Sequence, residues 1–367
     1  MSLFAGAAAA ETPKVTLGGV ADFQVGYVSE DLDTNQRAQA FRSDTEVTVR
    51  VDGKTDGGLG YGAGVDIETD TTADAYTQGT NASKTFLYVE GANWGRVEAG
   101  STTGAATALK VDASRIARAT GGIDGDFTYF LDAPGTQYLV TPDLVLDYGA
   151  GTLGNESQEN ANKVSYYTPR FAGFQAGISY IVDLNRGQGV NRFDNNTGAG
   201  GVAVASAVDN IFEGGINYEG KFGDVGFAAA VTGTTGSATV ATTEDLRAWN
   251  AGAKLSYQGF SVAGSYGDWG DSLRTATDGT DETSYWTAGL AYETGPFGAS
   301  VTYLSSEYDI ASTTTDAEFT NIAVGVDYKL APGLTPYAEV NFIEFDEATA
   351  ASDNDATVFI AGTQLSF

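Results

Sequence analysis

Hydrophobic and polar residues alternate at every second position over most of the chain. In the first such segment, Val15, Leu17, Phe23, Val25 and Tyr27 are separated by small or polar residues. Period-two alternation is typical of β-strands that have one apolar and one polar face. No long stretch repeats at the helical period, so the pattern predicts an all-β protein.

The connections between the predicted strands come in two lengths that alternate along the chain. Short turns rich in glycine and proline, such as 52–57 and 293–296, favour hairpins. The long, polar connections are about 29–40, 69–83, 102–160, 184–209, 233–245, 267–283, 306–317 and 346–355. We therefore predict sixteen strands, seven short turns and eight long loops, with both termini at the short-turn end. This even up-and-down meander indicates a 16-stranded antiparallel transmembrane β-barrel.

Aromatic residues flank four of the short turns. In a membrane barrel, such residues form a girdle where the strands meet the lipid headgroups. The predicted pairs are Tyr167/Phe171, Tyr218/Phe222, Tyr257/Phe260 and Tyr292/Phe297.

The composition excludes several kinds of chemistry. The 367 residues include no cysteine and no histidine, which excludes disulfides, thiolate nucleophiles and histidine-based catalysis. The 48 acidic residues outnumber the 19 basic ones, and this balance argues against a nucleic-acid partner. Nothing in the sequence fixes two carboxylates opposite one another, so we do not expect an enzyme.

The first ten residues are set apart from the predicted barrel. Residues Leu3 to Ala10 are small and apolar and precede Glu11-Thr12-Pro13, a pattern that resembles the end of a signal peptide cleaved after Ala10. An artificial alanine-rich end is the alternative interpretation. We predict that residues 11–367 form a single barrel domain.

Three segments resemble the trimeric general porins of Gram-negative bacteria, most closely the proteobacterial type. Residues 161–177 are similar to the strand–turn–strand that follows the third long loop of these porins. Residues 87–100 are similar to the hairpin that precedes that loop. The chain ends in a strand that closes on Phe367, and the resemblance covers about 15–367.

The resemblance implies that the third long loop, about 101–160, folds inward and narrows the pore. A basic wall would then face an acidic loop across the constriction. The alternation independently places Arg42 and Arg50 on the polar face of their strand, although they could instead pair with acidic residues of the same wall. The predicted constriction residues are Arg42 and Arg50 on the wall and Asp112, Asp124, Asp126 and Asp132 on the loop.

The resemblance also implies location and partners. The expected protein is a multi-pass barrel in the bacterial outer membrane, a homotrimer in contact with lipid and lipopolysaccharide. Phe367 would be the signal recognised by the barrel assembly machinery, standing on the lipid-facing side of a final strand that pairs with the first.

The expected function is passive diffusion of small hydrophilic solutes and ions. Carboxylates outnumber basic residues on the polar strand faces, which predicts weak cation selectivity. A substrate-selective porin is a variant of this hypothesis. The alternative from another class is a secreted or surface β-rich adhesin with Ca²⁺-binding acidic loops. Ca²⁺ within 121–126 is one interpretation of that segment, and a solvated acidic loop is the other. We expect no other cofactor.

Overall fold

The computed structural model describes most of the chain, including every barrel strand. The described residues are 12–32, 37–69, 81–131, 140–144, 158–159, 161–186, 196–197, 203–204, 208–273, 283–308, 317–346 and 353–367. Asp132 and the first ten residues lie outside these ranges.

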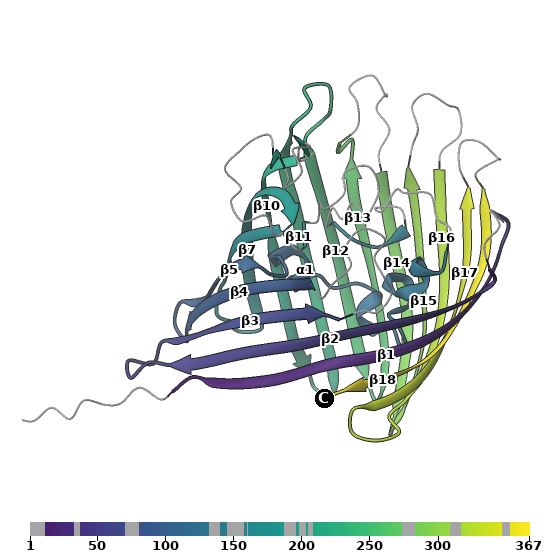
Figure 1. The fold of residues 1–367 in the computed structure, drawn as a ribbon, viewed down its shortest axis with the longest axis horizontal. Helices are drawn as coiled ribbons and strands as arrows, with labels where there is room; N and C mark the ends of the chain where they lie inside the picture. The colour runs from purple at the N-terminus through teal and green to yellow at the C-terminus, as the bar shows by residue number, and fades with distance from the viewer. Residues whose placement is uncertain are drawn as a thin grey trace, which may run out of the picture.

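Sixteen antiparallel strands close into one barrel (Figure 1). Each strand pairs with its neighbours in the chain, and the last strand pairs with the first. The barrel strands are β1 (Lys14–Glu30), β2 (Gln39–Lys54), β3 (Gly60–Glu68), β4 (Asn81–Gly91), β5 (Gly95–Ser101), β6 (Ala161–Tyr167), β7 (Phe174–Arg186), β10 (Val208–Phe222), β11 (Val225–Ala238), β12 (Leu246–Tyr257), β13 (Phe260–Gly270), β14 (Thr283–Thr294), β15 (Phe297–Tyr308), β16 (Ala317–Tyr328), β17 (Leu334–Asp346) and β18 (Asn354–Ser366). The predicted barrel and its number of strands are confirmed.

Two further strands lie outside the barrel. β8 (Asn196–Thr197) and β9 (Ala203–Val204) pair with each other in the long connection between β7 and β10. Among the described residues, no helix is long and apolar enough to cross a membrane.

The two faces of each strand follow the predicted alternation. On β1, Phe23 and Tyr27 are exposed on the outer face, whereas Gln24 between them is buried on the inner face. Because a closed barrel has no edge, every strand pairs its backbone groups on both sides. The outer face is thus apolar, and the inner face holds most of the polar groups.

The C-terminal residue closes the barrel seam. The backbone N–H of Phe367 donates to the Gly19 carbonyl, and the Gly19 N–H donates to the Phe367 carbonyl, both at 3.0 Å. The Phe367 side chain is exposed on the outer face together with Leu365 and Phe359. The predicted pairing of the first and last strands is confirmed.

The aromatic belt near the short turns differs from the prediction at one position. Tyr218 stacks on Phe222 at 6.2 Å, and Phe260 lies 4.4 Å from Tyr292. On β6, however, Tyr167 points into the lumen, where its hydroxyl donates to the Thr103 carbonyl at 3.3 Å. The outward-facing ring is Tyr166, since consecutive residues of a strand point to opposite faces.

Aromatic rings lie over glycines on the inner face of β3. A Cβ atom added to Gly62 would lie 2.5 Å from the Tyr88 ring, and one added to Gly64 would lie 2.5 Å from the Phe86 ring. Alanine cannot be accommodated at either position without displacing a ring. These glycines therefore let β4 side chains lie flat against the wall.

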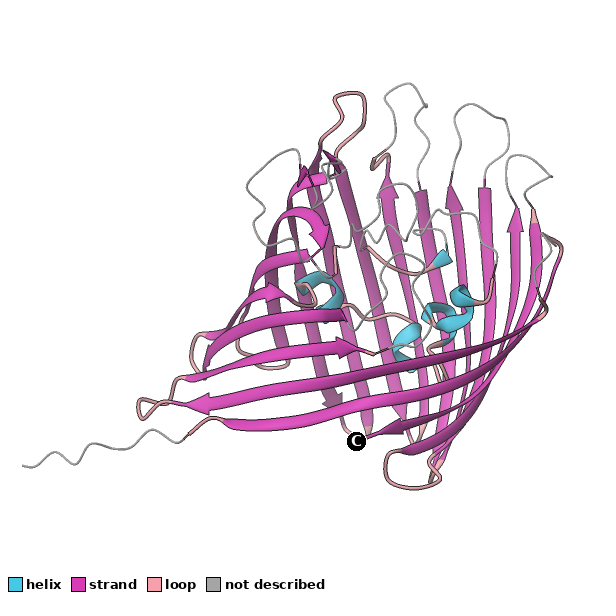
Figure 2. Ribbon diagram, viewed as in Figure 1, coloured by secondary structure: helices cyan, strands magenta, loops and turns pink. Residues whose placement is uncertain are grey.

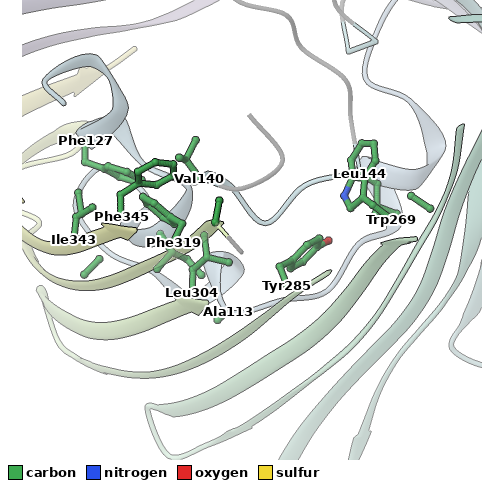
Figure 3. Packing of buried hydrophobic residues seen from close by; sticks show 14 of the residues in the cluster. Ala113, Phe127, Val140, Leu144, Trp269, Tyr285, Leu304, Phe319, Ile343 and Phe345 are labelled. Carbon is green, nitrogen blue, oxygen red and sulfur yellow. The ribbon is translucent and has the colours of Figure 1, made fainter. Parts of the chain in front are cut away.

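The lumen contains an apolar core near the long-loop ends of β15–β18 (Figure 3). Phe127 of the inward loop stacks on Phe319 of β16 at 6.5 Å, and Phe319 contacts Phe345 of β17 at 6.1 Å. All three rings are buried. Strict alternation assigns only polar groups to the lumen, but here the loop covers the wall and excludes water from it.

Candidate functional site

The connection between β5 and β6 folds into the barrel, where its short helices lie within the lumen (Figure 2). α1 (Ala105–Leu109) lies against β7, β10 and β11, and η1 (Ser114–Ile116) lies against β13 and β14. η2 (Gly122–Asp124) lies against β15–β17, and η3 (Asp126–Tyr129) lies beside β18. The inward loop, defined here as 102–131, thus follows the inner wall from β7 to β18.

Hydroxyl groups of the wall hold the backbone of the inward loop. Four backbone N–H groups of the loop donate to serine or threonine side chains on β7, β14 and β15. A serine or threonine whose side chain points into the lumen can accept such a bond. These backbone donors are therefore satisfied although the loop has little regular secondary structure. The pairs are Ala105 with Ser179 (2.9 Å), Ala113 with Thr287 (3.3 Å), Arg118 with Ser300 (2.9 Å) and Ile123 with Thr302 (3.3 Å).

Glu339 on β17 also anchors the inward loop, and it accepts more hydrogen bonds from the loop than any of these hydroxyl groups does. Its buried carboxylate accepts bonds from the Thr120 N–H at 3.2 Å and the Gly122 N–H at 3.1 Å. The Thr120 hydroxyl donates to it at 2.8 Å, and the Asn341 amide donates at 2.9 Å. The alternation along β17 predicts only that the Glu339 carboxylate points into the lumen. In the structure the inward loop covers it.

Arg118 anchors the same part of the loop through its side chain. Its guanidinium lies 3.7 Å from the Asp327 carboxylate of β16 and also contacts Glu293 at the end of β14. Asp327 is therefore neutralised by the loop rather than left free in the lumen.

Arg42 is the point where β2 meets the loop. Its guanidinium lies 2.7 Å from Asp44 on the same strand and 3.4 Å from Asp126 on the loop. It also lies over the Tyr129 ring, 3.8 Å from the centroid. Gln24 of β1 donates to Asp126. Arg42 and Asp126, both predicted constriction residues, are thus in contact rather than separated by the pore.

Other basic side chains on β2, β4 and β5 also form ion pairs on their own side of the lumen. Arg50 lies beside the Asp66 carboxylate of the neighbouring strand, so it pairs within the wall. The remaining pairs are Lys84 with Glu159 at 3.0 Å, and Arg96 with Glu98 at 2.6 Å and Glu90 at 3.0 Å.

Asp112 lies inside the loop and does not face the pore. It is fully buried, with its carboxylate 3.0 Å from Lys110 Nζ, and it accepts bonds from the Ser114 N–H and hydroxyl. Burial opposes its ionisation, but Lys110 and Ser114 outweigh that effect and lower its pKa. Lys110 also donates to the Pro142 carbonyl at 2.7 Å, so this pair holds two distant parts of the connection together.

Asp124 is the predicted loop residue that is most open to the lumen. Its side chain is partly open to solvent, although protein atoms surround the carboxyl group. This burial raises the pKa of Asp124, the Asp143 and Asp112 carboxylates also raise it, and Lys110 opposes the shift; the resulting pKa is about 7. Within the described ranges, no three acidic side chains converge as a metal site would require. Asp132 lies outside those ranges.

The sequence prediction did not identify Tyr129. Its ring covers Arg42 and is 67% exposed, so it presents an aromatic surface to the lumen. In the sequence, Tyr129 is marked only by its position close to Asp124 and Asp126, in a connection that is otherwise expected to be polar.

Comparisons with known proteins agree with this architecture. A family model described as Gram-negative porin matches residues 1–348. Uncharacterized proteins of Rickettsia conorii and Rickettsia typhi are 27% and 28% identical to the chain; each alignment covers 96% of this chain and 93% of the relative.

Solved porin structures share the fold. The anion-selective porin from Comamonas acidovorans has a TM-score of 0.63 and 17% identity, covering 97% of this chain and all of that one. A mutant of the Rh. blastica porin has a TM-score of 0.61 and 20% identity, covering 96% of this chain and all of the other. Porins of this kind are channels of the outer membrane, not enzymes. The chain belongs to the Gram-negative porin family.

Proposed function

We propose that the protein is a passive diffusion channel for small hydrophilic solutes and ions, with a weak preference for cations. This preference is supported by the ion pairing on the wall formed by β1–β5, where basic side chains are paired and several carboxylates are not. Arg42, Arg50, Lys84 and Arg96 are each paired with carboxylates. On the same wall, Asp22, Glu46 and Glu68 have no ion-pair partner within 4.0 Å among the described residues.

The loop side of the lumen adds to this negative field. Asp124 is exposed to the lumen, and Lys110 and Arg118 of the same loop are held by carboxylates, whereas Arg115 faces the short-turn end. Carboxylates that line a pore raise the local concentration of cations and lower that of anions. The related Comamonas porin is described as anion-selective, so we propose that selectivity differs within the shared fold.

The outer face supports a membrane location over the adhesin alternative. Exposed apolar side chains, such as Leu17, Ile216, Val262 and Leu290, recur on strands around the barrel. A soluble protein rarely exposes so large an apolar surface, whereas lipid tails solvate it well.

We propose that the barrel is a homotrimer that contacts lipopolysaccharide, as the resemblance to trimeric general porins implies. We also propose that Phe367 is read by the assembly machinery. If so, deleting Phe367 should reduce the assembled trimer in cells, while refolding from denaturant into detergent stays largely intact. Equal loss in both assays would indicate a role in stability alone.

Reconstitution into a planar bilayer tests the proposed function. The purified protein should need detergent and insert as open channels, with conductance steps grouped in threes. A monodisperse protein that stays soluble without detergent and forms no channels would contradict the proposal.

A further inference from the structure

A second lumen region, at the short-turn end, has the opposite charge character. A cavity of about 600 Å³ lies between the inward loop and the lower part of β10–β12. Its charged lining residues are the basic Lys110, Arg115, Arg170, Lys221 and Lys254 and the acidic Glu219. This ratio is the reverse of the whole chain, in which 48 acidic residues outnumber 19 basic ones.

Three of these cations have no carboxylate partner. Among the described residues, none lies within 4.0 Å of Arg115, Lys221 or Lys254. The Arg115 guanidinium donates one bond, to the Thr107 carbonyl at 2.6 Å, which leaves its other N–H groups available. Elsewhere in the lumen, Arg42 and Arg118 are each held by two carboxylates.

The strand register explains why the cavity is hollow. Ala228 lies directly between Glu219 of β10 and Lys254 of β12, and Gly226 lies between Lys221 and Ser256. Small residues therefore form the floor, while long basic side chains rise from the strands on either side. The end of α1 and the start of η1 cover this floor from the loop side.

We propose that this cavity, defined by Arg115, Lys221, Lys254 and Glu219, is a binding site for small anionic solutes that carry a phosphate or carboxylate group. Such groups accept charge-assisted bonds from several cations at once. The site is separate from the contact between Arg42 and Asp126. It would retain anions at one end of a channel whose remaining charges favour cations.

Equilibrium dialysis of the intact, detergent-solubilised protein tests the site without relying on conduction. One set of measurements uses radiolabelled inorganic phosphate, and the other uses radiolabelled succinate at equal ionic strength. The comparison shows whether the site binds phosphate groups or carboxylate groups. We expect saturable binding of at least one probe. The double variant Lys221→Gln/Lys254→Gln should weaken that binding by about tenfold or more. The matched control Lys14→Gln/Lys329→Gln removes the same charge at the same end, outside the cavity, and should leave the binding constant unchanged.

A variant with the opposite expected effect guards against structural damage. Glu219→Gln removes the one acidic lining side chain and releases Arg170, whose guanidinium lies 3.7 Å from it. Binding should tighten several-fold. The proposal is overturned if the wild-type protein binds neither probe saturably, or if the double variant and the control bind equally. Failure of this test would leave channel formation, the proposed function, unaffected.

Discussion

The guanidinium of Arg42 lies 3.4 Å from the carboxylate of Asp126, which joins the barrel wall to the far end of the inward loop. Glu339 on β17 anchors a neighbouring part of the loop, at Thr120 and Gly122, and only β18 and β1 lie between β17 and β2 in the barrel. The segment 120–126 is therefore fixed to one side of the barrel at two points and does not hang freely in the lumen. The pore that remains is bounded by the loop and by β2–β5.

Replacing Arg42 with glutamine should strengthen the cation preference. The substitution removes one positive charge and leaves Asp44 and Asp126 uncompensated. An unpaired charge about 8 Å from a passing ion in water changes its energy by about 0.5 kcal/mol, or about twofold in permeability ratio. The ratio of K⁺ to Cl⁻ permeability, measured from reversal potentials, should rise by about that factor. Lys14→Gln, at the short-turn rim, serves as the control, and an equal change in both variants would argue against a special role for Arg42.

Replacing Glu339 with alanine should loosen the inward loop. The Thr120 and Gly122 N–H groups would lose their acceptor, at a cost of about 1–3 kcal/mol each unless water reaches them. The barrel strands themselves should stay paired, because this carboxylate bonds to the loop and to its own strand. We expect larger and noisier single-channel currents with an unchanged barrel by circular dichroism. Glu46→Gln also removes a lumen acid but is predicted to keep the currents quiet. Quiet currents in Glu339→Ala would show that Arg118 and the wall hydroxyls suffice.

Acidification should weaken the cation preference through Asp124. Burial, with the nearby Asp143 and Asp112 carboxylates, raises the pKa of this carboxyl to about 7, so the group is mostly charged at pH 8 and mostly neutral at pH 6. Lowering the pH through this range removes negative charge from the lumen and should reduce the permeability ratio. In Asp124→Asn, the change between pH 6 and pH 8 should be smaller than in the wild-type protein. A wild-type ratio that stays constant across this range would contradict the assignment.

Adding a methyl group under the Tyr88 ring should destabilise the barrel. In Gly62→Ala, the new Cβ would lie 2.1 Å from the Val51 carbonyl oxygen and 2.5 Å from the Tyr88 ring, so both the backbone and the ring must move. Overpacking of this kind costs about 1–3 kcal/mol. The midpoint of urea unfolding from detergent should fall accordingly. Gly57→Ala is the matched control, because the atom nearest to a Cβ there is Thr55 Oγ1 at 3.9 Å, an ordinary van der Waals distance. Equal midpoints would contradict the prediction, because the ring and the Val51 backbone would then yield at no cost.

The barrel could be predicted from the sequence because each strand carries its own signal. Alternation sets which residues of β1 face outward, and the two loop lengths set the up-and-down order. The exception at Tyr167 has a simple cause. Because Tyr166 and Tyr167 are adjacent in β6, the alternation alone does not say which of the two faces outward. Only the register of β6 against its neighbours assigns Tyr166 to the outer face.

The arrangement of the lumen was less predictable, because it depends on where one irregular loop lies. Asp112 and Asp126 are equally acidic in sequence, but Asp112 is buried against Lys110, whereas Asp126 contacts Arg42 on β2. By its position on β17, Glu339 is expected to be a free charge in the lumen, but its carboxylate accepts hydrogen bonds from the loop backbone. The role of Glu339 follows from contacts with residues more than 200 positions away, such as Thr120. No local pattern encodes them.

The reversal potential of the reconstituted wild-type channel tests the central claim most directly. The measurement uses a tenfold KCl gradient at low ionic strength and pH 8, where the carboxylates of the lumen are charged and poorly screened. We expect a potential of the sign given by K⁺ permeating faster than Cl⁻, and we expect it to decrease as salt is raised on both sides. A potential of the opposite sign would contradict the central claim, because the basic groups would then control the passage of ions.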